Sequence, residues 1–242
     1  MISVMKHMRF LGLFVSFLFV AGCGGEKVSV VRAPAEGGKL VFVTKPTDPP
    51  YTYIDEKTKD YAGVEVEIAR AAAKKLGLEL EIRSLAFQDL LPSVRSGKAD
   101  YASNLITITP ARAKNVNFSR PYAGDGSAFL YRTGSPVPSL RRAKALRVGT
   151  EMASTCFFYL CDHDIDPTCY DDYAEMFAEF NKGKLDVVFY DAAAIRETVR
   201  TSNGAFSMSP LETREHYGIA IRKDYPALLE AVNQVIAERS SK

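Results

Sequence analysis

The sequence predicts an α/β protein made of two similar lobes. From Lys39 onward, short apolar runs typical of strands alternate with longer segments whose apolar residues recur at the helical period. The alternation begins again at Leu146, and residues 93–103 match residues 179–189: each segment ends a helix at Gly, continues Lys-x-Asp and enters a strand. Alternating strands and helices are typical of a largely parallel sheet covered by helices. Their repetition therefore predicts two lobes of related topology.

The first half of the chain contains the elements of one lobe. Residues 63–77, GVEVEIARAAAKKLG, place Val64, Ile68 and Leu76 on one helical face, and Gly77 ends the helix. The elements expected here are a strand at 39–44, a helix at 63–77, a strand at 78–84, a helix at 87–97 and a strand at 99–107.

The second half repeats this order and then returns to the first lobe. Its expected elements are a strand at 146–150, helices at 154–160 and 173–183, a strand at 185–190 and a helix at 192–200. The C-terminal segment predicts a strand and a helix that pack on the first lobe. We therefore expect lobe 1 to comprise residues 37–122 and 216–242, and lobe 2 residues 127–212. Two segments, near 122–126 and 212–216, would cross between them as a double-crossover hinge.

The first 22 residues have the composition of an export signal. Lys6 and Arg9 precede an apolar run of about 11 residues, which is too short to span a bilayer. Small residues then precede Cys23, as in bacterial lipoprotein signals, in which the cysteine becomes the lipidated first residue of the mature chain. An ordinary signal peptide cut near Gly22 is the alternative. Residues 23–38 are predicted to be a flexible tether between the lipid anchor and the folded protein.

The overall charge argues against one class of partner. The chain has 242 residues, of which 47% are hydrophobic and 25% charged, as is ordinary for a globular protein. Removal of residues 1–22 leaves 29 basic and 29 acidic residues, so the mature chain has no formal net charge. Nothing in this balance favours a nucleic acid as partner. We expect a periplasmic or otherwise extracytoplasmic monomer that its lipid holds at a membrane.

The segment 106–122, ITITPARAKNVNFSRPY, contains an arginine in an unfavourable place. Thr109 and Pro110 form a helix start, with the hydroxyl as N-cap and the proline in the first turn. Arg112 then lies at the positive end of the helix dipole, where a cation is destabilising. Together with the free backbone N–H groups there and the hydroxyl of Thr107, this arrangement favours a bound anion. The alternative is that Arg112 forms an ion pair at the surface.

Five segments occur in the order and spacing of a known family. They are YAGVEVEIARAAAKKLGL (61–78), FQDLLPSVRSGKAD (87–100), ITITPARAKNVNFSRPY (106–122), LRVGTEMAST (146–155) and GKLDVVFYD (183–191). From Leu40 to about Glu230 the chain resembles the extracellular solute-binding proteins of family 3, the polar amino acid receptors of ABC importers. The resemblance implies a fold of the periplasmic-binding-protein type II class, no cofactor and no catalysis. It also implies a small amino acid or related zwitterion as ligand and a membrane permease as partner.

The resemblance further implies roles for individual residues. Arg112 matches the arginine that holds the ligand α-carboxylate through two hydrogen bonds, and Thr107 and Ser154 match hydroxyls at the same end of the ligand. Asp191 matches the carboxylate that receives the α-ammonium, although it is also placed to cap the helix that follows it. Phe87 matches an aromatic wall, although a core position is the alternative. The residues that would surround the ligand side chain are Lys45, Asp48, Phe87, Asn104 and Glu151.

Some positions depart from the family pattern. Ala111 stands where the family often has Glu, and Ala153 stands where it prefers Gly, which would reshape the backbone around the ligand carboxylate. A second aromatic wall is expected near Asp48 but is missing, and Tyr51 and Tyr53 are candidates to replace it. The chain also ends sooner than is usual in the family, without a last aromatic-rich helix.

Two further functions stay open at this point. The protein could present its ligand to a membrane sensor instead of a permease, and nothing in the sequence separates these roles. Some proteins that resemble the family act as dehydratases on cyclic acids. Glu151 or Asp48 could act as a general acid, although no paired carboxylates form a recognisable catalytic set. The mixture of Lys45 with these two acids does not decide between acidic, basic and neutral ligand side chains.

Three cysteines surround His163 in the segment CFFYLCDHDIDPTC. A zinc site would want ligands in closely spaced pairs, which this segment lacks, so no metal is expected. In an exported protein a disulfide is the more natural use of cysteine, and we predict a bond between Cys161 and Cys169. Cys156 would then be a buried free thiol, although the sequence alone does not fix the pairing.

Overall fold

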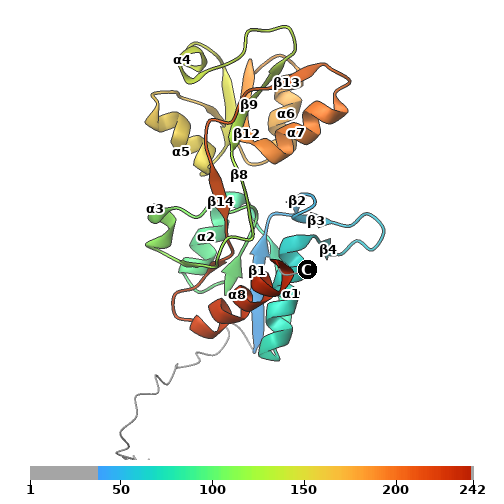
Figure 1. Ribbon diagram of the computed structural model, residues 1–242, viewed down its shortest axis with the longest axis vertical. Helices are drawn as coiled ribbons and strands as arrows, with labels where there is room; N and C mark the ends of the chain where they lie inside the picture. The colour runs from blue at the N-terminus through green and yellow to red at the C-terminus, as the bar shows by residue number, and fades with distance from the viewer. Residues whose placement is uncertain (1–37, 241–242) are drawn as a thin grey trace, which may run out of the picture. The chain divides into compact units, whose positions relative to one another are not determined.

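A computed structural model describes residues 38–240 (Figure 1). The predicted signal peptide, the predicted lipidation site Cys23 and the predicted tether as far as residue 37 lie outside the described residues. Within the described part, no helix combines the length and the apolar character that crossing a bilayer requires.

The first lobe is built on a five-stranded sheet. Its strands, in spatial order, are β5 (Glu79–Ser84), β1 (Lys39–Thr44), β6 (Tyr101–Ala102), β15 (Ala220–Ile221) and β7 (Asn117–Phe118). The pairs β1–β5 and β1–β6 are parallel, whereas β15 is antiparallel to both of its neighbours, β6 and β7. Four of the five strands therefore run in the same direction and only β15 runs opposite to them, as the prediction of a largely parallel sheet implies.

Helices cover both faces of this sheet because successive residues of β1 point to opposite sides. Leu40 and Phe42 pack with α1 (Val64–Leu76) and α8 (Pro226–Ser240), which lie together in Figure 1. Val41 and Val43 pack on the other face against α2 (Phe87–Arg95). The short α3 (Pro110–Ala113) begins at Thr109, whose hydroxyl accepts a hydrogen bond from the backbone N–H of Arg112, as predicted.

The second lobe repeats the arrangement. Its sheet has the order β11 (Thr168–Tyr170), β10 (Val148–Glu151), β12 (Val187–Asp191), β9 (Ser127–Arg132) and β13 (Phe206–Met208). Again four strands run in the same direction, and the fourth strand in the order, β9, is antiparallel to both neighbours. The helices of this lobe are α4 (Leu140–Ala143), α5 (Thr155–Asp162), α6 (Tyr173–Asn181) and α7 (Ala192–Thr201).

Two paired strands connect the lobes. β8 (Ala123–Asp125) runs from the first lobe to the second, and β14 (Glu215–Tyr217) returns antiparallel beside it. They continue into β9 and β15, the antiparallel strands of the two sheets. Gly126 allows the segments to lie close, because a Cβ at this position would be 2.1 Å from the carbonyl oxygen of Thr213. The predicted architecture of two α/β lobes joined by a double-crossover hinge is confirmed.

One predicted element is much shorter than expected. The strand predicted at 99–107 is a regular strand only at Tyr101–Ala102, although Asp100 and Ser103 also bond to β1 and Thr107 forms an isolated bridge with Tyr217. The chain leaves the sheet because Leu105 has a φ of 49°, in the left-handed region that a strand does not use. A small sheet of β2 (Thr47–Asp48), β3 (Thr52–Ile54) and β4 (Tyr61–Ala62), which was not predicted, precedes α1.

Candidate functional site

The candidate site lies where the parallel strands of both sheets end. Lys45 follows β1, Glu151 ends β10 and Asp191 ends β12. The carboxyl ends of parallel strands meet at one edge of each sheet, which is where α/β proteins bind ligands. An inner cavity at this place is lined by Asp48, Phe87, Asn104, Leu105, Thr107, Glu151, Ser154, Thr155, Cys156, Tyr190 and Asp191. Its volume of about 10 Å³ has room for about one water molecule.

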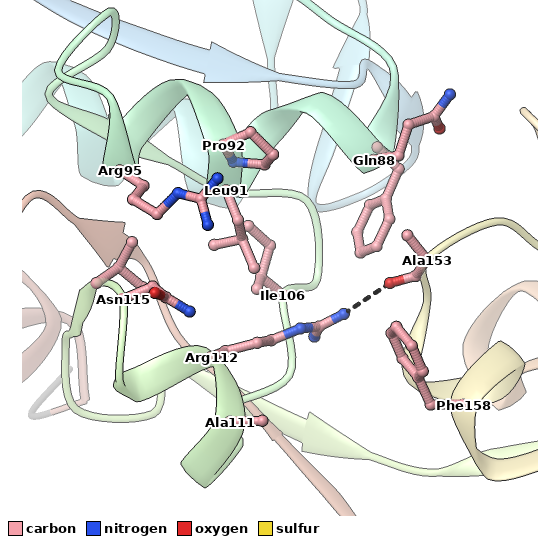
Figure 2. Close-up of a pocket in the computed structure, with 12 residues that line it drawn as sticks. Gln88, Leu91, Pro92, Arg95, Ile106, Ala111, Arg112, Asn115, Ala153 and Phe158 are labelled. Carbon is pink, nitrogen blue, oxygen red and sulfur yellow. Dashed lines mark hydrogen bonds between the residues drawn. The ribbon is translucent and has the colours of Figure 1, made fainter. Parts of the chain in front are cut away.

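Arg112 lies between this inner cavity and an outer one. It extends from α3 along an apolar outer cavity of about 290 Å³, which Phe87, Leu91 and Phe158 also line (Figure 2). Its Nη1 donates to the carbonyl oxygen of Thr107 at 3.0 Å, and its Nη2 donates to that of Ala153 at 3.3 Å. The guanidinium carbon lies 5.7 Å from the centre of the Phe87 ring. Arg112 therefore bridges the two lobes, and Phe87 lines both cavities.

The environment of Arg112 disfavours an isolated charge. Burial lowers the pKa of its guanidinium from the ordinary value, and the carboxylates of Glu215 and Asp191 oppose this effect. No ion pair joins Arg112 to another described residue, and its two hydrogen bonds reach only neutral carbonyl groups. A carboxylate that bound here would provide the charge partner that this cation lacks.

Ser154 is the N-cap of α5. Its Oγ accepts a hydrogen bond from the backbone N–H of Phe157 at 3.1 Å and donates to the carbonyl oxygen of Glu151 at 2.7 Å. The preceding residue, Ala153, has a φ of 60°, in the left-handed region. The alanine at this family glycine position is therefore held in a conformation that glycine adopts without strain.

This strain predicts a gain in stability on substitution. Ala153→Gly removes the cost of a left-handed side chain, about 1–2 kcal/mol, and adds the backbone entropy of glycine in the unfolded chain. We expect a net increase of up to about 1 kcal/mol in the free energy of unfolding, measured by urea denaturation. Ala71→Gly, the same change within the right-handed α1, is the control and should lose about 1 kcal/mol. Equal losses in both variants would contradict the prediction.

Asp191 occupies the N-cap position of α7 but does not cap it. Its side chain makes no capping hydrogen bond, so the structural role that the sequence left open is not seen. Burial raises the pKa of the Asp191 carboxyl well above its usual value, and the carboxylates of Glu215, Asp48 and Glu151 raise it further. A cation placed beside Asp191 would favour its ionised form.

The residues predicted to contact the ligand side chain form an interlobe cluster. The Lys45 ammonium donates to Glu151 Oε1 and, at 2.8 Å, to the carbonyl oxygen of Asp171. The two charged side chains are only 7% and 4% exposed. Burial raises the pKa of Glu151 to about 7 even though Lys45 opposes the shift. Beside this pair, the Asn104 amide donates to Asp48 Oδ2 at 2.8 Å.

The sequence did not reveal two buried carboxylates next to the site. Glu215, in the connecting strand β14, accepts hydrogen bonds from four hydroxyl groups. The donors are Thr107, Ser127 at 2.8 Å, Thr155 at 3.0 Å and Thr213 at 2.8 Å. These hydroxyls belong to both lobes and to the connection, so Glu215 ties the three parts together. Glu215 thus accepts the hydrogen bond of the Thr107 hydroxyl, which was predicted to contact a ligand.

Glu65, on α1, is the other buried carboxylate. Its Oε1 accepts hydrogen bonds from the backbone N–H of Leu105, at 2.8 Å, and from the hydroxyl of Tyr122. Its Oε2 has no hydrogen-bond partner among the described residues. Burial raises the pKa of Glu65 to about 7. Glu65 therefore holds Leu105 in its left-handed conformation at the edge of the inner cavity.

The predicted disulfide is not formed. Cys161 and Cys169 are both free thiols in the structure, and Cys156 is free and buried. Cys161 lies on the exposed side of α5, whereas the sulfur of Cys169 turns toward the carbonyl oxygen of Pro167, 3.8 Å away. No group of three or more metal-ligating side chains is present among residues 38–240.

The comparisons with known proteins identify the family. Residues 40–242 match the model of the bacterial extracellular solute-binding proteins, family 3. The chain belongs to this family. It is a solute-binding protein and not an enzyme of the same fold, since its relatives are likewise named for the solutes that they bind.

Relatives and solved structures of the family cover most of the chain. The ABC transporter arginine-binding protein 1 of Escherichia coli is 29% identical over 96% of this chain and 93% of its own. The L-cystine-binding protein TcyJ of the same organism is 29% identical over 84% of this chain and 78% of its own. The structure of holo ArgBP from T. maritima is 30% identical, with a TM-score of 0.77 over 84% of this chain and 91% of its own.

Proposed function

We propose that this protein captures a polar amino acid through both charges of its α-amino-acid group. The observation that carries the proposal is that Arg112, in α3 of the first lobe, bonds only neutral carbonyl groups among the described residues, while Asp191 ends β12 of the second lobe and lines the inner cavity. Arg112 would gain a charge partner from a carboxylate, and Asp191 is ionised more readily beside a cation. The ligand carboxylate binds Arg112 beside Thr107 and Ser154, which line the inner cavity, and the ligand ammonium binds Asp191. Phe87 forms an apolar wall beside them.

The relatives support an amino acid as the class of ligand. Those described above are named for arginine and L-cystine, and an ancestral arginine-binding protein with 31% identity and a TM-score of 0.76 has been solved with glutamine bound. These ligands share the α-amino-acid group and differ in their side chains. The shared group is what Arg112 and Asp191 are placed to bind.

The protein delivers this ligand to a membrane permease of an ABC importer. The name of the arginine-binding relative, which places it in an ABC transporter, supports this role over presentation to a sensor. The lobes open and close about the paired strands β8 and β14, and the protein acts as a monomer outside the cytoplasm. A lipid on Cys23 holds it at the membrane, and the mass of the mature N-terminal peptide would reveal that modification.

The experiment that tests the proposal compares amino acids with analogues that lack the α-ammonium. The chain from Gly24 onward is freed of carried-over ligand by unfolding and refolding, then screened by thermal shift and measured by calorimetry. Asp191→Asn should weaken the binding of an amino acid by about thirtyfold or more, because the buried ammonium loses its charged partner. Binding of the matching deaminated carboxylate should hardly change.

Asp164→Asn, which removes an exposed carboxylate paired with Lys144, is the control and should bind like the unmodified protein. Equal weakening of both ligand types by Asp191→Asn would reject the assigned role of Asp191. If the folded protein bound no amino acid at all, the proposed function itself would be wrong.

A further inference from the structure

Two groups of charged side chains lie at the inner cavity. Asp191 lines the cavity, and Arg112 bonds to Thr107, which also lines it; the proposed function assigns Arg112 and Asp191 to the α-amino-acid group of the ligand. Glu151 lines the cavity too and bonds to Lys45 of the other lobe, and we call Lys45 and Glu151 the distal pair. Asp48, a second carboxylate in the lining, raises the pKa of both Glu151 and Asp191.

The distal pair is fixed as well as buried. The Lys45 ammonium has a second acceptor in the second lobe, the carbonyl oxygen of Asp171. The Tyr190 hydroxyl donates to Glu151 Oε2 at 3.3 Å. Both charged groups are therefore held in place inside the protein, where the loss of either partner leaves an uncompensated buried charge.

A ligand side chain has to share this space with the pair. A long uncharged side chain that separated Lys45 from Glu151 would leave both buried charges unpaired. A side chain that enters between the two residues separates their charges. If it carries only an ammonium, it pairs with Glu151 and leaves Lys45 without a carboxylate. If it carries only a carboxylate, it pairs with Lys45 and leaves Glu151 unpaired.

We infer that the ligand has an amino-acid group at each end. Its distal ammonium pairs with Glu151, supported by Asp48, and its distal carboxylate pairs with Lys45. Such a ligand replaces one buried ion pair by two and leaves no charge of the distal end without a partner. This inference rests on the proposed function, because it assumes that Arg112 and Asp191 hold the first amino-acid group.

The first test uses four ligands and the unmodified protein, stripped of carried-over ligand. meso-2,6-Diaminopimelate and L-cystine carry two amino-acid groups. L-Lysine is diaminopimelate without its distal carboxylate, and L-2-aminopimelate is diaminopimelate without its distal ammonium. We expect calorimetry to give at least one double-ended compound a Kd about thirtyfold or more below those of both single-ended analogues, since each analogue leaves a buried charge unpaired.

The second test removes each distal charge from the protein. Lys45→Met should abolish the advantage of the double-ended ligand over L-lysine, because the distal carboxylate then has no partner. Glu151→Gln should abolish its advantage over L-2-aminopimelate. Lys144→Met, which removes an exposed ammonium paired with Asp164 in the same lobe as Glu151, is the matched control and should change neither ratio. If Lys45→Met does not fold, the ligand series on the unmodified protein decides alone.

The outcomes separate this inference from the proposed function. If L-lysine, L-arginine or L-2-aminopimelate binds as tightly as both double-ended compounds, the inference is wrong and the proposed function stands. Unchanged binding of the preferred double-ended ligand to a folded Lys45→Met variant would also overturn it. If no amino acid binds the folded protein, both ideas fail.

Discussion

Arg112→Ala is expected to weaken amino-acid binding by about a hundredfold or more. The ligand carboxylate would then be buried without a cation, and truncating one partner of such a pair costs about 2–5 kcal/mol. The guanidinium also bridges the lobes through the carbonyl oxygens of Thr107 and Ala153, and this bridge would be lost. Calorimetry of the variant with the preferred amino acid measures the effect.

Two further variants sharpen this result. Arg112→Lys keeps the charge but not the planar pair of donors, so it should bind more weakly than the unmodified protein and better than the alanine variant. Arg147→Ala removes an exposed arginine paired with Asp186 and should leave affinity unchanged. An Arg112→Ala protein that is folded and binds its amino acid with normal affinity would rule out the carboxylate assignment.

Glu65→Gln is expected to make the stability of the protein less dependent on pH. Burial raises the pKa of Glu65 to about 7 in the folded protein, against an ordinary value of 4.5. The folded state therefore prefers the protonated carboxyl more strongly than the unfolded state does. The resulting stabilisation is complete below pH 4.5 and is lost as the pH rises to 7. Ionisation of this one group then costs the folded protein about 3 kcal/mol.

The glutamine variant keeps an acceptor for the Leu105 N–H and cannot ionise. Its free energy of unfolding should exceed that of the unmodified protein by about 2–3 kcal/mol at pH 8, and the difference should shrink toward pH 4.5. Urea denaturation across this range measures it. Glu151, whose pKa is also raised to about 7, affects both proteins alike and cancels in the comparison. A difference that is constant with pH would contradict the assigned titration of Glu65.

The local parts of the fold were predictable from sequence. The helix predicted at 63–77 is observed at Val64–Leu76, and Gly77 has the left-handed φ of 67° expected of a helix stop. The strand predicted at 99–107 was wrong for a nonlocal reason. Its apolar pattern continues to Ile106, but the chain turns at Leu105, whose N–H bonds to Glu65, forty residues earlier. Such a contact leaves no trace in a local pattern.

The candidate site also has a part that the sequence predicts and a part that it does not. The position of Arg112 in the first turn of a helix is a local feature, and it predicted an anion-binding residue. The partnership of Lys45 with Glu151 joins residues 106 positions apart on different lobes, so only the folded chain reveals it. Glu215 was missed because a single charged residue in a predicted hinge segment is usually exposed. Its four hydroxyl partners come from four other places in the chain.

The returning strand β15 has a consequence for the order in which the lobes fold. All the strands of the second sheet lie between Ser127 and Met208, so that lobe is complete as one continuous stretch of chain. The first sheet lacks the strand between β6 and β7 until Ala220–Ile221 joins it, and α1 lacks its partner α8 until the last residues arrive. During synthesis from the N-terminus, the second lobe should therefore fold first. The first lobe can be completed only after the C-terminal strand and helix have been made.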